Sequence, residues 1–128
     1  MRLSAEISVG ELIDKVTILE IKRDKIRDEA KLANIAREYS ALIETLEREV
    51  AINEAVEGLR RELKAVNAEL WRIEDDIRAQ ERAQTFGADF VTLARSVYQM
   101  NDRRSDLKRR INILTESDLV EEKSYEAY

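Results

Sequence analysis

The apolar positions of this chain recur at helical spacing, most regularly between residues 54 and 114. Two segments, about residues 54–83 and about residues 90–114, place apolar residues alternately three and four positions apart, the heptad pattern of helices that pack along a seam. The first seam consists of Val56, Leu59, Leu63, Val66, Leu70, Ile73 and Ile77. The second consists of Leu93, Val97, Met100, Arg104, Leu107, Ile111 and Leu114.

The two seams pair in one register when the chain folds back at about Thr85. Facing residues then have numbers that sum to 170, so that Ile77 faces Leu93. Gly87 or Asp89 is the expected cap of the helix that follows the turn. The pattern predicts a long, coiled-coil-like antiparallel hairpin with opposite charges along one flank. The expected flanking ion pairs are Glu69 with Arg103 and Glu62 with Arg110.

A first helix is expected to begin after Ser8, which forms a capping box with Glu11 three residues later. Its apolar residues lie on more than one side, with Ile18 and Ile21 outside the main stripe, so it should contact two neighbours. The polar stretch 27–34 predicts a turn before a second helix at about residues 32–50. The alternative is one unbroken helix that runs to about Val50.

These segments predict an all-α fold, an antiparallel helical bundle of about four helices in a single domain over residues 1–128. One hairpin cannot bury its own stripe, so the first two helices or a second subunit must cover it. Residues 115–128 form an acidic tail that either folds back on the bundle or stays frayed.

The composition supports a helical fold and excludes several kinds of catalytic and metal site. The 128 residues include no proline and three glycines. The absence of cysteine and histidine excludes a thiol nucleophile, a zinc–thiolate site and a Glu-x-x-His di-iron bundle. The net charge of −5 disfavours nucleic acid as a partner, and no apolar run is long enough to span a bilayer. We therefore expect a cytoplasmic protein without a membrane or nucleic-acid partner.

Arg104 stands at a seam position in an otherwise apolar stripe. The interpretation that we favour is a partly buried guanidinium that pairs with a carboxylate on another helix and sets register. The functional alternative is an anion ligand that faces a pocket between helices. The basic face from Arg103 to Arg110 could likewise bind phosphate, polysaccharide or nucleic acid, although Asp102, Asp106 and the acidic tail can neutralise it.

Trp71 stands beside an acidic cluster of Glu69, Glu74, Asp75 and Asp76. Carboxylates on facing helices hold Mg²⁺ in all-α nucleotide pyrophosphohydrolases, but such sites need several carboxylates from two helices. We therefore expect no cofactor, with Mg²⁺ only if the chain binds a phosphorylated ligand. Tyr98 and Trp71 are candidate stacking surfaces. The candidate residues for a ligand site or polar network are Lys15, Glu20, Trp71, Glu74, Arg95, Tyr98, Asn101, Asp102 and Arg104.

The chain resembles an uncharacterised bacterial family of short helical proteins, a domain of unknown function. Members occur beside, or fused to, glycosyltransferases and tetratricopeptide-repeat proteins of surface-polysaccharide synthesis. The matching motifs are Ser8-Val9-Gly10-Glu11-Leu12, Asp14-Lys15, Thr17-Ile18-Leu19-Glu20-Ile21-Lys22, Leu70-Trp71, Ile73-Glu74-Asp75, Leu93-Ala94-Arg95-Ser96-Val97-Tyr98, Asn101-Asp102 and Val120-Glu121-Glu122-Lys123-Ser124-Tyr125. The resemblance implies no activity. One account of its polar residues is a tail that folds back, with Glu121 or Glu122 meeting Arg95 or Lys15.

Our leading hypothesis is a non-catalytic accessory or protein-interaction module, linked to bacterial surface-polysaccharide synthesis and self-associating as a homo-oligomer, a dimer being the simplest case. An apolar strip left exposed, such as Ile18 and Ile21, would mark its interface. The alternative is binding or hydrolysis of a phosphorylated or nucleotide-sugar ligand in an inter-helix pocket. A third hypothesis is a nucleic-acid-associated protein that uses the face from Arg103 to Arg110.

Overall fold

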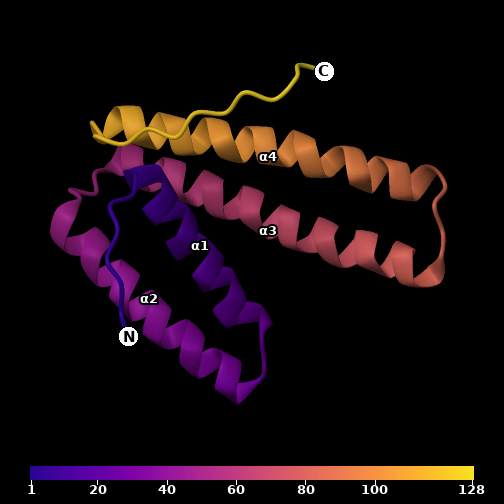
Figure 1. Cartoon of the computed structure of the whole chain (residues 1–128), viewed down its shortest axis with the longest axis horizontal. Coiled ribbons are helices and arrows are strands. Elements are labelled where there is room, and N and C mark those ends of the chain that lie inside the picture. Colours follow the sequence, from indigo (N-terminus) through magenta and orange to yellow (C-terminus); the bar gives the residue numbers. More distant parts are fainter.

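The computed structural model describes residues 1–128 and contains four α-helices and no strands. The helices are α1 (Val9–Lys25), α2 (Glu29–Glu49), α3 (Glu54–Ala83) and α4 (Ala88–Leu114). Figure 1 shows α1 and α2 as one antiparallel pair that lies across one end of a longer antiparallel pair, α3 and α4. The predicted all-α bundle is confirmed.

The helix starts follow from polar caps in the sequence. Ser8, Asp28 and Asn53 each accept a hydrogen bond from the amide nitrogen three residues on, at 2.9–3.1 Å, which satisfies a backbone donor that has no partner inside the helix. Gly87 precedes α4 without a side-chain cap. The α3 helix ends at Gln84 in the left-handed region (φ 58°, ψ 38°), which turns the chain toward α4.

The break between α1 and α2 is shorter than the polar stretch 27–34 suggested. It spans only Ile26–Asp28, and α2 begins three residues earlier than expected, at Glu29. The alternative of one unbroken helix is wrong, because Ile26 and Asp28 are both extended and the Asp28 carboxylate caps the new helix. The predicted bounds of α3 agree with the structure, and α4 begins two residues before the predicted start.

The core forms where all four helices meet. Its central residues come from α1, from the end of α2, and from the parts of α3 and α4 nearest the tail. They are Leu12, Ile13, Val16, Leu46, Val56, Leu59, Leu63, Val66, Leu107 and Ile111. The α1 helix packs against α2, α3 and α4, one neighbour more than the two that its apolar residues on several sides predicted. Ile21 is therefore buried, and the expectation that it would belong to an exposed strip is wrong.

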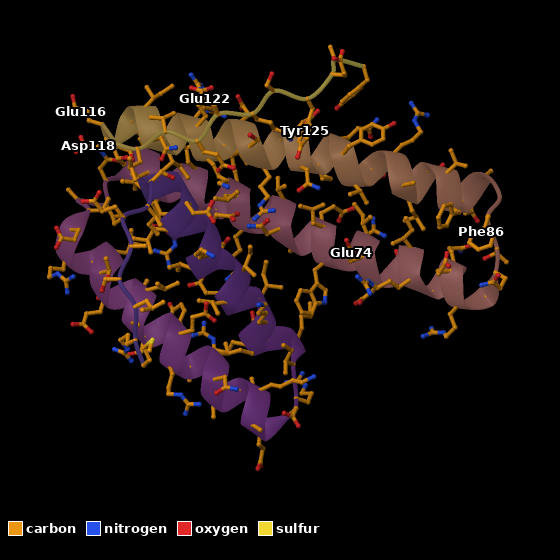
Figure 2. All side chains as sticks on the ribbon, in the orientation of Figure 1. Glu74, Phe86, Glu116, Asp118, Glu122 and Tyr125 are labelled. Carbon is orange, nitrogen blue, oxygen red and sulfur yellow. The ribbon has the colours of Figure 1, made fainter.

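The far half of the α3–α4 hairpin extends beyond α1 and α2 (Figure 1). Its seam residues Leu70, Ile77, Leu93, Val97 and Met100 are half-buried, and Ile73 is buried. At the near end most seam residues are buried, and Leu114 is exposed. The first two helices thus cover only part of the apolar stripe of the hairpin. The surface that remains includes exposed apolar residues at and near the hairpin tip, which Figure 2 marks by Phe86.

The flanking charges do not pair across the hairpin as predicted. Glu69 forms its ion pair with Arg72, three residues away on the same helix, and no ion pair joins Glu62 to Arg110. A partner within one turn is reached with less ordering of side chains than a partner on the facing helix.

Residues 115–128 leave the end of α4 and turn back along it (Figure 1). Glu116 has a positive φ of 53° at this reversal. No helix of the structure is both long and apolar enough to cross a bilayer.

Candidate functional site

The most deeply buried charged side chain is Asp14 of α1, which has no exposed surface. Its Oδ1 accepts hydrogen bonds from Asn67 Nδ2 of α3 at 2.8 Å and from Arg104 Nε of α4 at 2.9 Å, and its Oδ2 accepts from Arg104 Nη2. Asn67 also donates to the hydroxyl of Thr17 at 2.9 Å. One carboxylate therefore joins three helices, and every buried polar atom in the group has a partner.

Arg104 takes the position that we favoured from the sequence, as the partner of a carboxylate on another helix. The hydrogen bond with Asp14 raises the pKa of Arg104 further above its ordinary value, and burial only partly opposes this. The Arg104 side chain is 29% exposed. Its Nε and Nη2 bind Asp14, and its Nη1 has no protein partner.

One turn further along α4, Lys108 lies between two carboxylates. Its Nζ is 2.7 Å from Glu11 of α1 and 2.8 Å from Glu121 of the tail. Burial acts to lower the pKa of Lys108, but the hydrogen bonds with Glu11 and Glu121 outweigh it and raise that pKa. Lys108 therefore stays charged and links the tail to α1.

The start of α1 lies directly against the end of α4. The Gly10 amide donates to Asn112 Oδ1 at 2.7 Å, and the Val9 amide donates to Ser117 Oγ at 3.1 Å. A Cβ added at Gly10 would overlap the backbone oxygen of Lys108. Glycine is thus required here by close helix contact rather than by backbone conformation, since its φ is not positive.

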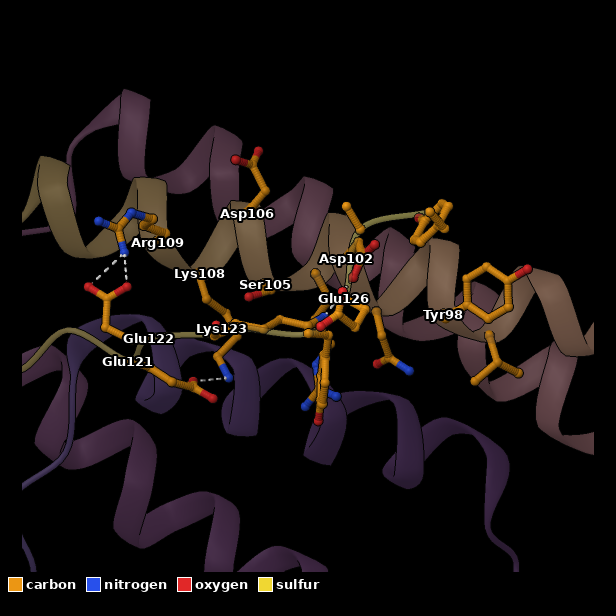
Figure 3. Close-up of a pocket in the computed structure, with 17 residues that line it drawn as sticks. Tyr98, Asp102, Ser105, Asp106, Lys108, Arg109, Glu121, Glu122, Lys123 and Glu126 are labelled. Atoms are coloured by element: carbon orange, nitrogen blue, oxygen red, sulfur yellow. Dashed lines mark hydrogen bonds and ion pairs between the residues drawn. The ribbon is translucent and has the colours of Figure 1, made fainter.

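The tail is held along α4 by side-chain contacts (Figure 3). Glu122 pairs with Arg109 at 3.1 Å, and Lys123 pairs with Asp102 at 2.8 Å. The Tyr128 ring packs edge-on against Tyr98 at 5.0 Å. Hydrogen bonds from Lys123 and Tyr128 lower the pKa of Asp102, and the same contact with Asp102 raises the pKa of Tyr128. The structure thus places Glu121 and Glu122 beside Lys108 and Arg109, and not beside Arg95 or Lys15.

An open groove of about 1470 Å³ separates α4 from the tail. We call it the tail groove; α4 residues from Val97 to Arg109 and tail residues 121–128 line it. Four of the nine residues proposed from the sequence line this groove: Tyr98, Asn101, Asp102 and Arg104.

The other five proposed residues lie elsewhere. Glu20 belongs to a second polar cluster, where it accepts from Tyr39 and Arg60 and lies 3.5 Å from Lys64. Lys15 is exposed and 3.9 Å from Glu11. The remaining three are the half-buried Trp71, the exposed Glu74, which pairs with Arg78, and the exposed Arg95, which has no ion pair.

The acidic residues around Trp71 do not converge on one point. Glu69 and Asp76 both bind Arg72, and Glu74 binds Arg78. No group of three or more carboxylates in the structure is arranged to hold a metal ion.

The sequence interpretation missed Asn67, Lys108 and Asn112 as members of the buried network. A signal was present in α1, where Asp14 and Thr17 lie among residues that are apolar on several sides. A polar residue enclosed by apolar neighbours on such a helix is buried, and it then needs partners.

The comparisons with known proteins give one match. A family model described as "Family of unknown function (DUF6165)" matches residues 3–128. No curated protein and no solved structure matches the chain.

Proposed function

The chain belongs to this family of unknown function, DUF6165, and on that premise we propose that it is a non-catalytic interaction module that self-associates through the far half of its α3–α4 hairpin. The observation that carries the proposal is the seam that α1 and α2 leave half-exposed. The motif resemblance supports an accessory role in bacterial surface-polysaccharide synthesis, and a cytoplasmic location is part of the same proposal.

Apolar side chains remain exposed on α4 in the far half of the hairpin. Val91 is exposed and lies seven residues before Tyr98 on the same side of α4, where the ring of Tyr98 contacts Tyr128 of the tail. Leu93 and Val97 lie between them in sequence and are half-buried. Phe86 and Phe90 extend this surface to the tip, where their rings meet edge to face at 5.3 Å. An apolar strip on a paired helix surface typically marks a contact with another protein.

A second copy of the hairpin has a surface of the right kind to cover this one. Two hairpins with matching heptad seams complete a four-helix bundle, in which each seam closes against the other. In a dimer with two-fold symmetry, the same surface of each subunit contacts its counterpart on the other subunit. The charges near the tip are of both signs, for example Glu81, Arg82 and Arg95, so a second copy meets no single-sign repulsion.

Light scattering across a concentration series tests self-association. We expect the unmodified chain to be a dimer and Val91→Lys, at a side chain 51% exposed, to be a monomer with unchanged helicity. Ile113→Lys is the matched control, because Ile113 is 66% exposed on α4 but lies at the opposite end of the hairpin. A chain that stays monomeric throughout the series, or a dimer that only Ile113→Lys dissociates, would show that the proposal is wrong.

The alternative of a phosphorylated or nucleotide-sugar ligand receives less support. Each cation of the tail groove already has a carboxylate partner, which leaves no free positive charge for a phosphate. Hydrolysis with Mg²⁺ would further require converging carboxylates.

A further inference from the structure

We propose that the tail groove binds a neutral, polyhydroxylated ligand, a sugar or short sugar chain, against α4. The groove is open along its length and larger than the roughly 300–1,000 Å³ of ordinary small-molecule pockets, so it can hold more than one sugar ring. Its walls come from two independent segments, a rigid helix and an extended tail (Figure 3).

The charge of the groove argues against an anionic ligand. Arg104, Lys108, Arg109 and Lys123 are each bound to a carboxylate. The charged groups of the lining that have no ion pair are Asp106 and Glu126, and both are acidic. A phosphate would therefore meet free negative charge and find no free cation, whereas an uncharged hydroxyl group carries no such penalty.

The side of α4 that faces the tail carries polar atoms without protein partners. Asn101 and Ser105 are four residues apart and line the groove, and neither side chain forms a hydrogen bond within the protein. Arg104 also lines the groove and adds its unused Nη1. An amide, a hydroxyl and a guanidinium nitrogen together offer donors and acceptors, which is the mixture that adjacent sugar hydroxyls can satisfy.

Three tyrosine rings line the same groove. Tyr98 comes from α4, and Tyr125 and Tyr128 come from the tail. Tyr125 is 84% exposed, and the Lys123 ammonium lies 5.2 Å from its ring centre. A tyrosine ring offers an apolar face and a polar end, which suits the C–H face and hydroxyl edge of a sugar ring.

A ligand in the groove would also stabilise the position of the tail on α4. Two of the three ion pairs that hold the tail are exposed, and exposed ion pairs stabilise weakly, while ordering an extended segment costs backbone entropy. No backbone–backbone hydrogen bond joins residues 118–128 to the helices. Its free peptide groups can bond to a ligand beneath them, which would help to hold the tail on α4.

Ligand titrations monitored by amide NMR chemical shifts test the proposal. The neutral probes are maltotriose and N-acetylglucosamine, and the anionic probes are inorganic phosphate and glucose 6-phosphate. We expect the neutral probes to shift resonances of Asn101, Ser105 and Tyr125, and the anionic probes to bind more weakly. Asn101→Ala should weaken binding about tenfold through lost hydrogen bonds, without lowering the melting temperature, because this side chain has no protein partner.

Asn34→Ala is the matched control, because Asn34 is an exposed asparagine on α2, outside the groove, and its loss should leave sugar affinity unchanged. Three outcomes would overturn the proposal. They are stronger binding of phosphate or glucose 6-phosphate than of the neutral probes, no groove shifts with any probe, or shifts that Asn101→Ala leaves unaltered.

Discussion

Asp14 and Arg104 are 90 residues apart in the chain, and both nitrogen donors on one edge of the Arg104 guanidinium bind the Asp14 carboxylate. This pair fixes α1 against α4, and Asn67 adds α3 to the same carboxylate. A polar group enclosed in an apolar core stabilises the fold only while its partners remain in place.

Asp14→Ala should therefore destabilise the protein by about 3 kcal/mol, because it leaves Arg104 and Asn67 without their acceptor. The expected cost is at the lower end for a buried pair, since Arg104 is partly exposed to water. Urea denaturation followed by circular dichroism measures it. The control Glu74→Ala, which removes an exposed ion pair within one helix, should change stability by less than about 0.5 kcal/mol. Equal effects of the two substitutions would contradict the role given to Asp14.

Gly10→Ala should destabilise the protein by about 1–3 kcal/mol, because the added methyl group overlaps the Lys108 carbonyl oxygen and forces α1 away from α4. Gly58→Ala makes the same chemical change inside α3 and meets no atom. It should stabilise the helix by about 1 kcal/mol. Thermal unfolding of the two variants should thus move the melting temperature in opposite directions, and a loss of stability in both would count against the close contact.

The tail contact at Asp102 should depend on pH. Lys123 and Tyr128 depress the folded-state pKa of Asp102, so the contact contributes fully above the ordinary carboxyl value of 3.8 and is lost as the pH falls through the lower, folded-state value. NMR titration of the Asp102 carboxyl carbon should give a midpoint below 3.8. In Lys123→Ala the midpoint should move up toward that value, and an unchanged midpoint would mean that the pair does not form.

Salt should loosen the tail without opening the bundle. The Debye length falls from about 10 Å at 0.1 M salt to about 3 Å at 1 M, which screens exposed ion pairs such as Arg109 with Glu122. The enclosed pair of Asp14 and Arg104 is screened much less. Because the chain has no cysteine, a variant with Ala127→Cys and Ala94→Cys carries spin labels at these two positions and nowhere else. We expect their distance distribution to broaden with salt while the circular dichroism signal stays constant. A distribution that salt does not alter would show that other contacts hold the tail.

The α3–α4 hairpin was the part most accessible to sequence reasoning. Its heptads and the turn after residue 83 are local patterns, and the bounds of α3 follow from them. Arg104 was identified as a buried ion-pair partner for the same reason, since a charge in a seam is visible without knowledge of the neighbours. The short break at Ile26–Asp28 was harder, because an Asp cap without glycine or proline is a weak signal.

The angle at which the two helix pairs cross could not be predicted from the sequence. The angle at which α1 meets α4 decides that Asp14 binds Arg104, that Ile21 is buried, and that the far half of the hairpin is uncovered. Such an angle depends on side-chain interlocking and on the single small residue Gly10, not on periodicity. The path of the tail likewise depends on long-range charge partners.

The contact between α1 and α4 also has a consequence for how the chain folds. Each hairpin closes through a loop of three or four residues, so its helices pair early and at small entropic cost. The contacts of Gly10 with Asn112 and of Asp14 with Arg104 join segments 102 and 90 residues apart, and they form only when two preassembled hairpins dock. The buried polar network therefore forms after the folding transition state. Its loss mainly speeds unfolding and leaves the rate of folding nearly unchanged.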